Sequence, residues 1–121
     1  MNETLLLVEE TIGSHKQIHH VVVNAGKIVQ MQQDNQLRES VHSCDIINAD
    51  GQAVVWAAKF LNKPLKERVA GIDLMERIVE LSFQKNYKIY FLGTEEEIVS
   101  KMVEHYANEY HPNIIAGYRN G

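Results

Sequence analysis

The sequence predicts an α/β protein with a Rossmann-like, mainly parallel sheet and helices on both faces. Short β-branched runs alternate along the chain with helical stretches of ten or more residues. Connections of that kind are typical of right-handed β-α-β crossovers between parallel strands. The 121 residues suffice for one domain and are too few for two. We therefore expect residues 1–121 to form a single α/β domain.

Apolar residues recurring every three or four positions predict the helices, as Leu5, Val8 and Ile12 do in the first of them. The predicted helices are residues 3–14, 25–34, 35–42, 52–61, 73–86 and 94–109. Asp73 and Glu76 have the D-x-x-E spacing of a capping box, so that helix is expected to begin at Asp73. The next helix is also expected to be capped, after a turn at Gly93.

Runs of β-branched and aromatic residues predict the strands. They are residues 19–24, 45–48, 88–92 and 113–117. The strand at 88–92 is apolar throughout after its lysine, which predicts burial on both faces. Pro112 is expected to separate the last helix from the last strand.

Composition and charge narrow the function classes. The net charge of −4 and the scattered basic residues argue against a nucleic-acid partner. Cys44, the only cysteine, is expected to be a small buried apolar residue. The six histidines lack metal-site spacing, so we expect no metal. The chain has no signal peptide and no apolar run of membrane-spanning length, which makes the cytoplasm the expected location.

Ligands of parallel α/β sheets bind beyond the carboxyl ends of the strands. Asp50 follows one predicted strand and precedes Gly51, which leaves little backbone bulk around the carboxylate. Asp50 could act as a general base on a sugar hydroxyl. The alternative is that Asp50 caps the helix from Gln52 or only forms an Asp-Gly turn.

Other polar positions near strand ends also have two interpretations each. Asn24 could hydrogen-bond a sugar or base, or cap the next helix. Arg68 could bind a diphosphate, or pair with Glu67 or Asp73 on the surface. Gly71 could allow close approach to a ligand, or only a turn.

Gly93 stands between a strand and a helix start, a position where phosphate often binds. Glu95, Glu96 and Glu97 would repel a phosphate from this helix start. Gly93 is therefore expected to contact a base or ribose instead.

Several sequence motifs, taken in their order along the chain, resemble those of one protein family. They are Val21 to Ala25 followed by Lys27-Ile28-Val29; Asn48-Ala49-Asp50-Gly51 followed by Val54 to Ala57; Lys63-Pro64-Leu65 with Glu67 to Met75; and Tyr90 to Gly93. In these motifs the chain resembles the WecG/TagA/CpsF glycosyltransferases (glycosyltransferase family 26).

The resemblance implies an inverting transfer of an N-acetylmannosamine-type sugar from a UDP donor to polyprenyl-diphosphate-linked N-acetylglucosamine, without a metal or other cofactor. By the same resemblance, the reaction serves teichoic acid or other cell-surface polysaccharide synthesis. The resemblance also implies that the protein acts at the inner face of the plasma membrane. Asp50 is the implied base. Asn24, Gly51 and Gly93 are implied substrate-binding positions, as are Arg68, Gly71 and Asp73 of the R-V-x-G-x-D motif.

The chain departs from the family pattern in two residues and in length. Val22 replaces a common Thr, and Gly26 replaces a larger residue. Members are usually about twice as long, so we expect the N-terminal, base-carrying part of the domain. Uncovered sheet edges would favour self-association into a homo-oligomer. The alternatives are an inactive fragment and a small nucleotide-binding or interaction domain.

Overall fold

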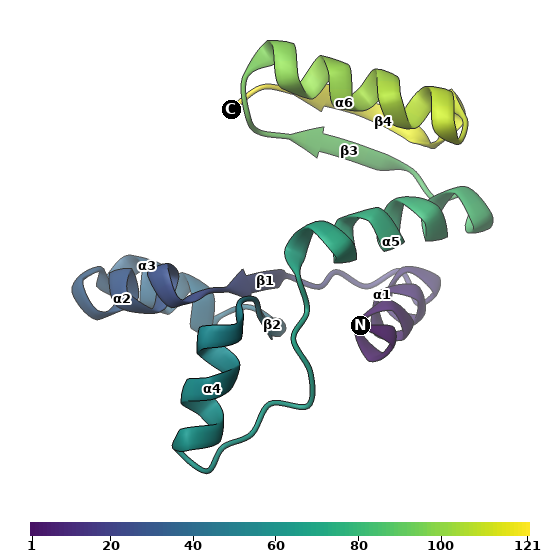
Figure 1. Cartoon of the computed structure of the whole chain (residues 1–121). Helices are drawn as coiled ribbons and strands as arrows, with labels where there is room; N and C mark the ends of the chain where they lie inside the picture. The colour runs from purple at the N-terminus through teal and green to yellow at the C-terminus, as the bar shows by residue number, and fades with distance from the viewer. The chain divides into compact units, whose positions relative to one another are not determined.

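The structure, a computed structural model, describes all residues from 1 to 121 and divides into two compact units. The first unit is Met1–Leu74 and the second is Met75–Gly121. Figure 1 labels the helices and strands in chain order. Each unit contains helices and one pair of parallel strands. The predicted α/β class with parallel strands is therefore confirmed, with the strands divided between two two-stranded sheets.

The first unit is built around the parallel pair of β1 and β2. In chain order its elements are α1 (Asn2–Gly13), β1 (His20–Val23), α2 (Ala25–Gln33), α3 (Asn35–His42), β2 (Ile46–Ala49) and α4 (Gln52–Phe60). The register runs from His20 opposite Ile46 to Val23 opposite Ala49. Beyond α4 the chain returns to β2, where the Val69 backbone N–H donates to the Ala49 carbonyl at 3.0 Å. Val69 is fully buried there.

The second unit packs helices against the parallel pair of β3 and β4. Its elements are most of α5 (Gly71–Lys85), β3 (Ile89–Leu92), α6 (Glu96–Glu109), the 3₁₀ turn η1 (Pro112–Ile114) and β4 (Ile115–Arg119). Figure 1 shows α6 lying along the strand pair. The core consists of Val79, Phe91, Val99, Tyr106 and Ile114. The rings of Phe91 and Tyr106 stack with centroids 5.7 Å apart.

The Tyr90 ring lies close to Gly117 across the pairing of β3 and β4. The pairing shifts after Ile89, so that Tyr90 lies opposite Gly117. A Cβ atom at Gly117 would lie only 2.9 Å from Cε2 of the Tyr90 ring. Glycine is therefore the residue that this pairing accommodates.

Three predicted helix and strand starts are corrected. α5 begins at Gly71 and not at Asp73, because the Leu74 N–H already bonds to the Ala70 carbonyl. The predicted cap of α6 is absent: its N-cap residue, Glu95, makes no side-chain hydrogen bond. β4 begins at Ile115, since Pro112 starts a 3₁₀ turn over the residues predicted to open the strand.

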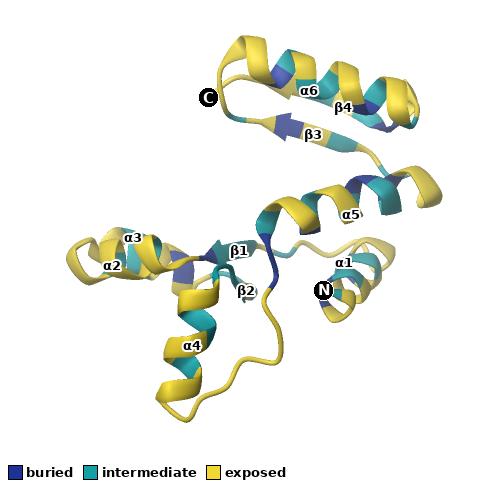
Figure 2. Ribbon diagram, in the orientation of Figure 1, coloured by how far each residue is buried: buried dark blue, intermediate teal, exposed yellow.

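The prediction that β3 is buried on both faces is wrong. Phe91 points into the core, whereas Leu92 is 74% exposed and Tyr90 is also exposed. Figure 2 shows this alternation of buried and exposed positions along β3. The strand is apolar on both faces, but the core cluster covers only one of them.

Candidate functional site

Asn24 and Asp50 follow the carboxyl ends of two paired strands. Val23 and Ala49 are opposite one another in the parallel register, and Asn24 and Asp50 come next in each chain segment. The Asp50 N–H donates to the Val23 carbonyl at 2.9 Å, which continues the ladder beyond β2. The backbone therefore holds these two polar residues at one end of the sheet, where α/β proteins bind ligands.

The Asp50 side chain does not cap α4, so that interpretation is wrong. The N-cap position belongs to Gly51, and no side chain hydrogen-bonds the free N–H groups there. Gly51 has φ 98° and ψ 136°, a conformation that residues with a Cβ adopt only under strain. This turn leaves the Asp50 carboxylate directed at Arg68, whose Nε lies 3.5 Å from Oδ1.

Arg68 reaches Asp50 from the segment that lines the outer side of β2. The neighbouring residues, Val69 and Ala70, are buried, and the bond from Val69 to Ala49 fixes the backbone. The predicted surface pairing with Glu67 or Asp73 is not formed: Arg68 pairs with Asp50, and Glu67 pairs with the N-terminal amine. The Arg68 side chain is 49% exposed and that of Asp50 is 35% exposed. Both charged groups can therefore be reached from solvent.

Asn24 caps α2, as one of its two interpretations predicted. Its Oδ1 accepts a hydrogen bond from the Lys27 N–H at 2.9 Å. The side-chain amide N–H groups make no bond to the protein, so they remain able to donate to a ligand. The capping role is established by the structure, and the ligand role stays a prediction.

Lys27 is a cation near this end of the sheet that the site prediction did not include. Its Nζ donates to the Val22 carbonyl at 2.8 Å. Successive carbonyls of a strand point to opposite edges, and that of Val23 faces β2, so Lys27 lies on the other edge of β1. The only sequence signal that places Lys27 near the site is its position three residues after the Asn24 cap.

Gly71 and Asp73 lie in the first turn of α5. A Cβ atom at Gly71 would lie 3.4 Å from the Val22 side chain, so the start of α5 lies beside β1. Asp73 is exposed. An acidic residue in a first helical turn is stabilised by the positive end of the helix dipole.

A hydrogen bond between β1 and β2 was also missed. His20 Nε2 lies 2.6 Å from Asn48 Oδ1. Side chains alternate between the faces of a sheet, so Asn48 shares a face with His20 and Val22. The partners are far apart in sequence, and only the register brings them together. The polar face therefore continues from His20 towards Asp50.

The opposite face of this sheet borders an apolar cavity of about 460 Å³. The strands line it with Val23, Ile47, Asn48 and Ala49. From α4 and its C-cap come Val54, Ala57, Ala58 and Leu61. The cavity reaches the residues directly before Asn24 and Asp50. The carboxyl end of the β1–β2 sheet thus has a polar side and an apolar side.

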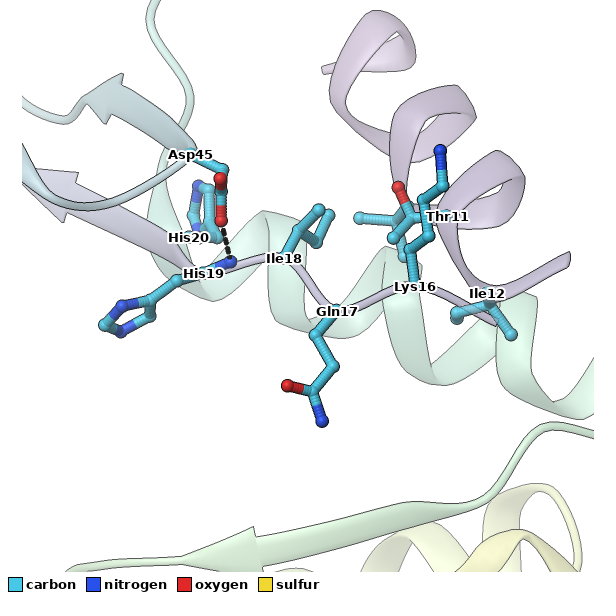
Figure 3. Close-up of a pocket in the computed structure, with 9 residues that line it drawn as sticks. Thr11, Ile12, Lys16, Gln17, Ile18, His19, His20 and Asp45 are labelled. Atoms are coloured by element: carbon cyan, nitrogen blue, oxygen red, sulfur yellow. Dashed lines mark hydrogen bonds between the residues drawn. The ribbon is translucent and has the colours of Figure 1, made fainter. Parts of the chain in front are cut away.

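A larger cavity, of about 750 Å³, lies at the amino ends of β1 and β2. Figure 3 shows it between α1 and the chain entering β1, with Lys16, Gln17 and Ile18 along one wall. Asp45 Oδ2 accepts from the His19 N–H at 2.7 Å, which ties the two strands together. This is the strand end opposite to Asp50.

Gly93 belongs to the second unit. It has φ 122°, and its N–H donates to the Arg119 carbonyl at 3.0 Å. That N–H is therefore not free for a ligand. Glu96 and Glu97 occupy the first turn of α6, as the sequence indicated.

No group of three or more His, Cys, Asp or Glu side chains is arranged to hold a metal ion. No helix is long and apolar enough to cross a bilayer.

Comparison with known proteins decides the family. Residues 1–121 match the model of the glycosyl transferase WecG/TagA/CpsF family. The chain belongs to this family. The resemblance noted in the sequence is therefore confirmed over the whole chain, and so is the glycosyltransferase class of the family.

Three curated relatives of this WecG/TagA/CpsF chain share one name, N-acetylglucosaminyldiphosphoundecaprenol N-acetyl-beta-D-mannosaminyltransferase. The Bacillus spizizenii protein is 33% identical over 65% of this chain and 31% of its own length. The Bacillus subtilis protein is 30% identical over 73% of this chain and 34% of its own. The Staphylococcus aureus protein is 30% identical over 69% of this chain and 32% of its own length. The match thus spans about a third of each relative.

Proposed function

We propose that this chain carries the general base of an inverting glycosyltransferase. The transferred group is an N-acetylmannosamine-type sugar, the donor is a UDP-sugar, and the acceptor is N-acetylglucosamine linked to a polyprenyl diphosphate. The names of the three relatives support the sugar and the acceptor. The family resemblance supports the UDP donor, the place at the inner face of the plasma membrane, and a role in teichoic acid or other cell-surface polysaccharide synthesis.

One observation supports the assignment of Asp50 as the general base most directly. The Asp50 carboxylate follows the carboxyl end of β2, is part-exposed, and is not used to cap α4. In the proposed step Asp50 accepts the proton of an acceptor hydroxyl as its oxygen attacks the anomeric carbon. The bond from that carbon to the diphosphate breaks, and UDP leaves with the electron pair. Attack from the side opposite to UDP inverts the anomeric centre.

The donor diphosphate requires positive charge, and Arg68 is the proposed source. Its two terminal guanidinium nitrogens donate to no protein oxygen, so they can bind a phosphate as a fork. We propose that Asn24 contributes its amide N–H groups. Gly51, Gly71 and Asp73 shape the surroundings of the general base, Asp50. Gly93 is proposed to contact the uracil or the ribose of the nucleotide. The proposed reaction uses no metal.

Two other functions remain alternatives. The chain could bind the donor without transferring the sugar, or it could be a small nucleotide-binding or interaction domain. Uncovered strand edges support the further proposal of a homo-oligomer. Donor binding and transfer must therefore be measured separately.

Titration calorimetry with UDP tests the donor site, and UDP release from UDP-N-acetylmannosamine with a lipid-linked N-acetylglucosamine analogue tests transfer. Transfer that Asp50→Asn abolishes, with UDP binding retained, would support the whole proposal. Binding without transfer would favour the inactive alternative. Absence of UDP binding would contradict the donor site.

A further inference from the structure

An apolar helix without cover adjoins the proposed base. α4 begins directly after Gly51, and none of its residues is buried. Val54, Ala57 and Leu61 face the apolar cavity. At 100° per residue, Trp56 and Phe60 point to the opposite side of the helix. Apart from Gln52 and Lys59, the helix thus carries apolar residues on both sides, and a helix with two apolar sides is normally covered on both.

The outer side of α4 is the most exposed apolar surface near the site. Trp56 is 66% exposed and Phe60 is 87% exposed. They are four residues apart and therefore lie one above the other on one helix face. A contiguous exposed patch of large apolar residues commonly marks an interaction surface.

The charged residues within the segment that carries this patch are all positive. Residues 51–66 contain Lys59, Lys63 and Lys66 and no acidic residue, although the whole chain has a net charge of −4. Lys66 pairs with Glu3, whereas Lys59 and Lys63 have no acidic partner. α2, whose Ile28 lines the same cavity, also contains a lysine and no acidic residue.

We propose that α4 and the loop after it, residues 52–65, dock on an anionic lipid surface. Tryptophan favours the boundary between lipid and water, because its ring is apolar and its N–H is polar. Lys59 and Lys63 would be attracted to anionic headgroups while their aliphatic stems lie along apolar surface. A helix of nine residues is too short to span a bilayer and lies in the interface instead.

A second copy of the chain fits this surface less well. A symmetric dimer through α4 would bring the same lysines of both copies together, and like charges across an interface are unfavourable. The lipid surface supplies the opposite charge. This inference rests on the proposed place at the membrane and names the surface that docks there. Docking itself requires no turnover, and it would bring Asp50 close to a lipid-linked acceptor.

Trp56 is the only tryptophan, so its fluorescence reports on this surface directly. We expect its emission to shift to the blue, and the chain to sediment, with vesicles of phosphatidylcholine and phosphatidylglycerol. Binding should weaken with phosphatidylcholine alone and with added salt. Lys59→Gln and Lys63→Gln should each lower vesicle affinity about fivefold. Phe60→Ser should weaken binding at every salt concentration, because it removes apolar contact.

Ile98→Ser is the matched control, because it removes an exposed apolar side chain from α6 and should leave vesicle binding unchanged. Unchanged emission and no sedimentation with either vesicle would overturn the proposal. A blue shift that needs no vesicles and grows with protein concentration would also overturn it, in favour of a second copy. These vesicles contain no polyprenyl lipid, so a failed transfer assay would leave the docking result standing.

Discussion

Arg68 holds its guanidinium Nε 3.5 Å from the Asp50 carboxylate, at the carboxyl end of β2. The proposed diphosphate-binding cation and the proposed base are therefore partners in the structure without ligand. Part-exposed pairs of this kind contribute little to stability, because water screens them and both side chains lose freedom. A diphosphate that binds the terminal guanidinium nitrogens would compete with Asp50 for this cation and release the carboxylate for the acceptor.

Arg68→Gln should separate binding from stability. We expect UDP affinity to fall roughly 10- to 100-fold, since hydrogen bonds to charged groups contribute about 1.5–3 kcal/mol. The free energy of unfolding should change by less than about 1 kcal/mol. Calorimetry and urea denaturation measure the two effects. Arg77→Gln, in an exposed pair with Glu80 on α5, is the control and should leave UDP affinity unchanged.

Asn24→Asp and Asn24→Ala should distinguish the capping role of this residue from its ligand role. Asp caps helices as well as Asn, so Asn24→Asp should retain stability, whereas Asn24→Ala should cost about 1 kcal/mol. Both changes remove the amide donors, and Asp also adds negative charge. We therefore expect both to weaken UDP binding, with Asp weakening it more. Equal UDP affinity for Asn24→Asp and the wild type would contradict the ligand role.

The parts of the fold predicted from sequence are those with local signals. A short helix was predicted at residues 35–42, and α3 has these bounds, Asn35–His42, with Asp34 as its cap. The β-branched run at 19–24 likewise predicted β1. The cap of α3 lies within a few residues of the helix, whereas β1 pairs with the distant β2, and only its residue preferences are local.

The site depended on contacts that no local signal reveals. The pairing of Asp50 with Arg68 requires the chain after α4 to return along β2, through the bond from Val69 to Ala49. The bond between His20 and Asn48 depends on the register of two strands. Sequence spacing could name Asp50 as a candidate base but could not decide between base and cap.

Gly51→Ala should destabilise the protein. The positive φ of 98° at Gly51 is strained for a residue with a Cβ, at a cost of about 1–3 kcal/mol. Urea denaturation should show the loss. Gly13→Ala is the matched control: no atom lies within 4 Å of its Cβ position, and its φ is not positive. That variant should be unchanged or stabilised by up to about 1 kcal/mol.

Phe91 and Leu92 are neighbours on β3 with opposite surroundings. Phe91 stacks on Tyr106 in the core, so Phe91→Ala should lower the free energy of unfolding by about 3–5 kcal/mol. Leu92 is exposed, so Leu92→Ala should change it by less than about 0.5 kcal/mol. Similar losses for both variants in urea denaturation would show that both faces of β3 are covered in solution.

Tyr106 should make the stability fall at alkaline pH. Burial raises the pKa of its hydroxyl above the usual 10, and the nearby Glu76 and Glu109 raise it further. Between the ordinary pKa and the raised one, the folded state binds more protons than the unfolded state, so the free energy of unfolding decreases as pH rises. The contribution is therefore complete below about pH 10 and is lost above it. Burial and Glu109 raise the pKa of Tyr110 in the same direction.

Tyr106→Phe removes this titrating group and keeps the ring that stacks on Phe91. Urea denaturation between neutral and strongly alkaline pH should show a shallower decline for this variant than for the wild type. Tyr118→Phe, which changes an exposed tyrosine of β4, is the control and should follow the wild-type curve. If the Tyr106→Phe curve also follows the wild type, then ionisation of Tyr106 does not limit alkaline stability, and the core around Phe91 tolerates the charged phenolate.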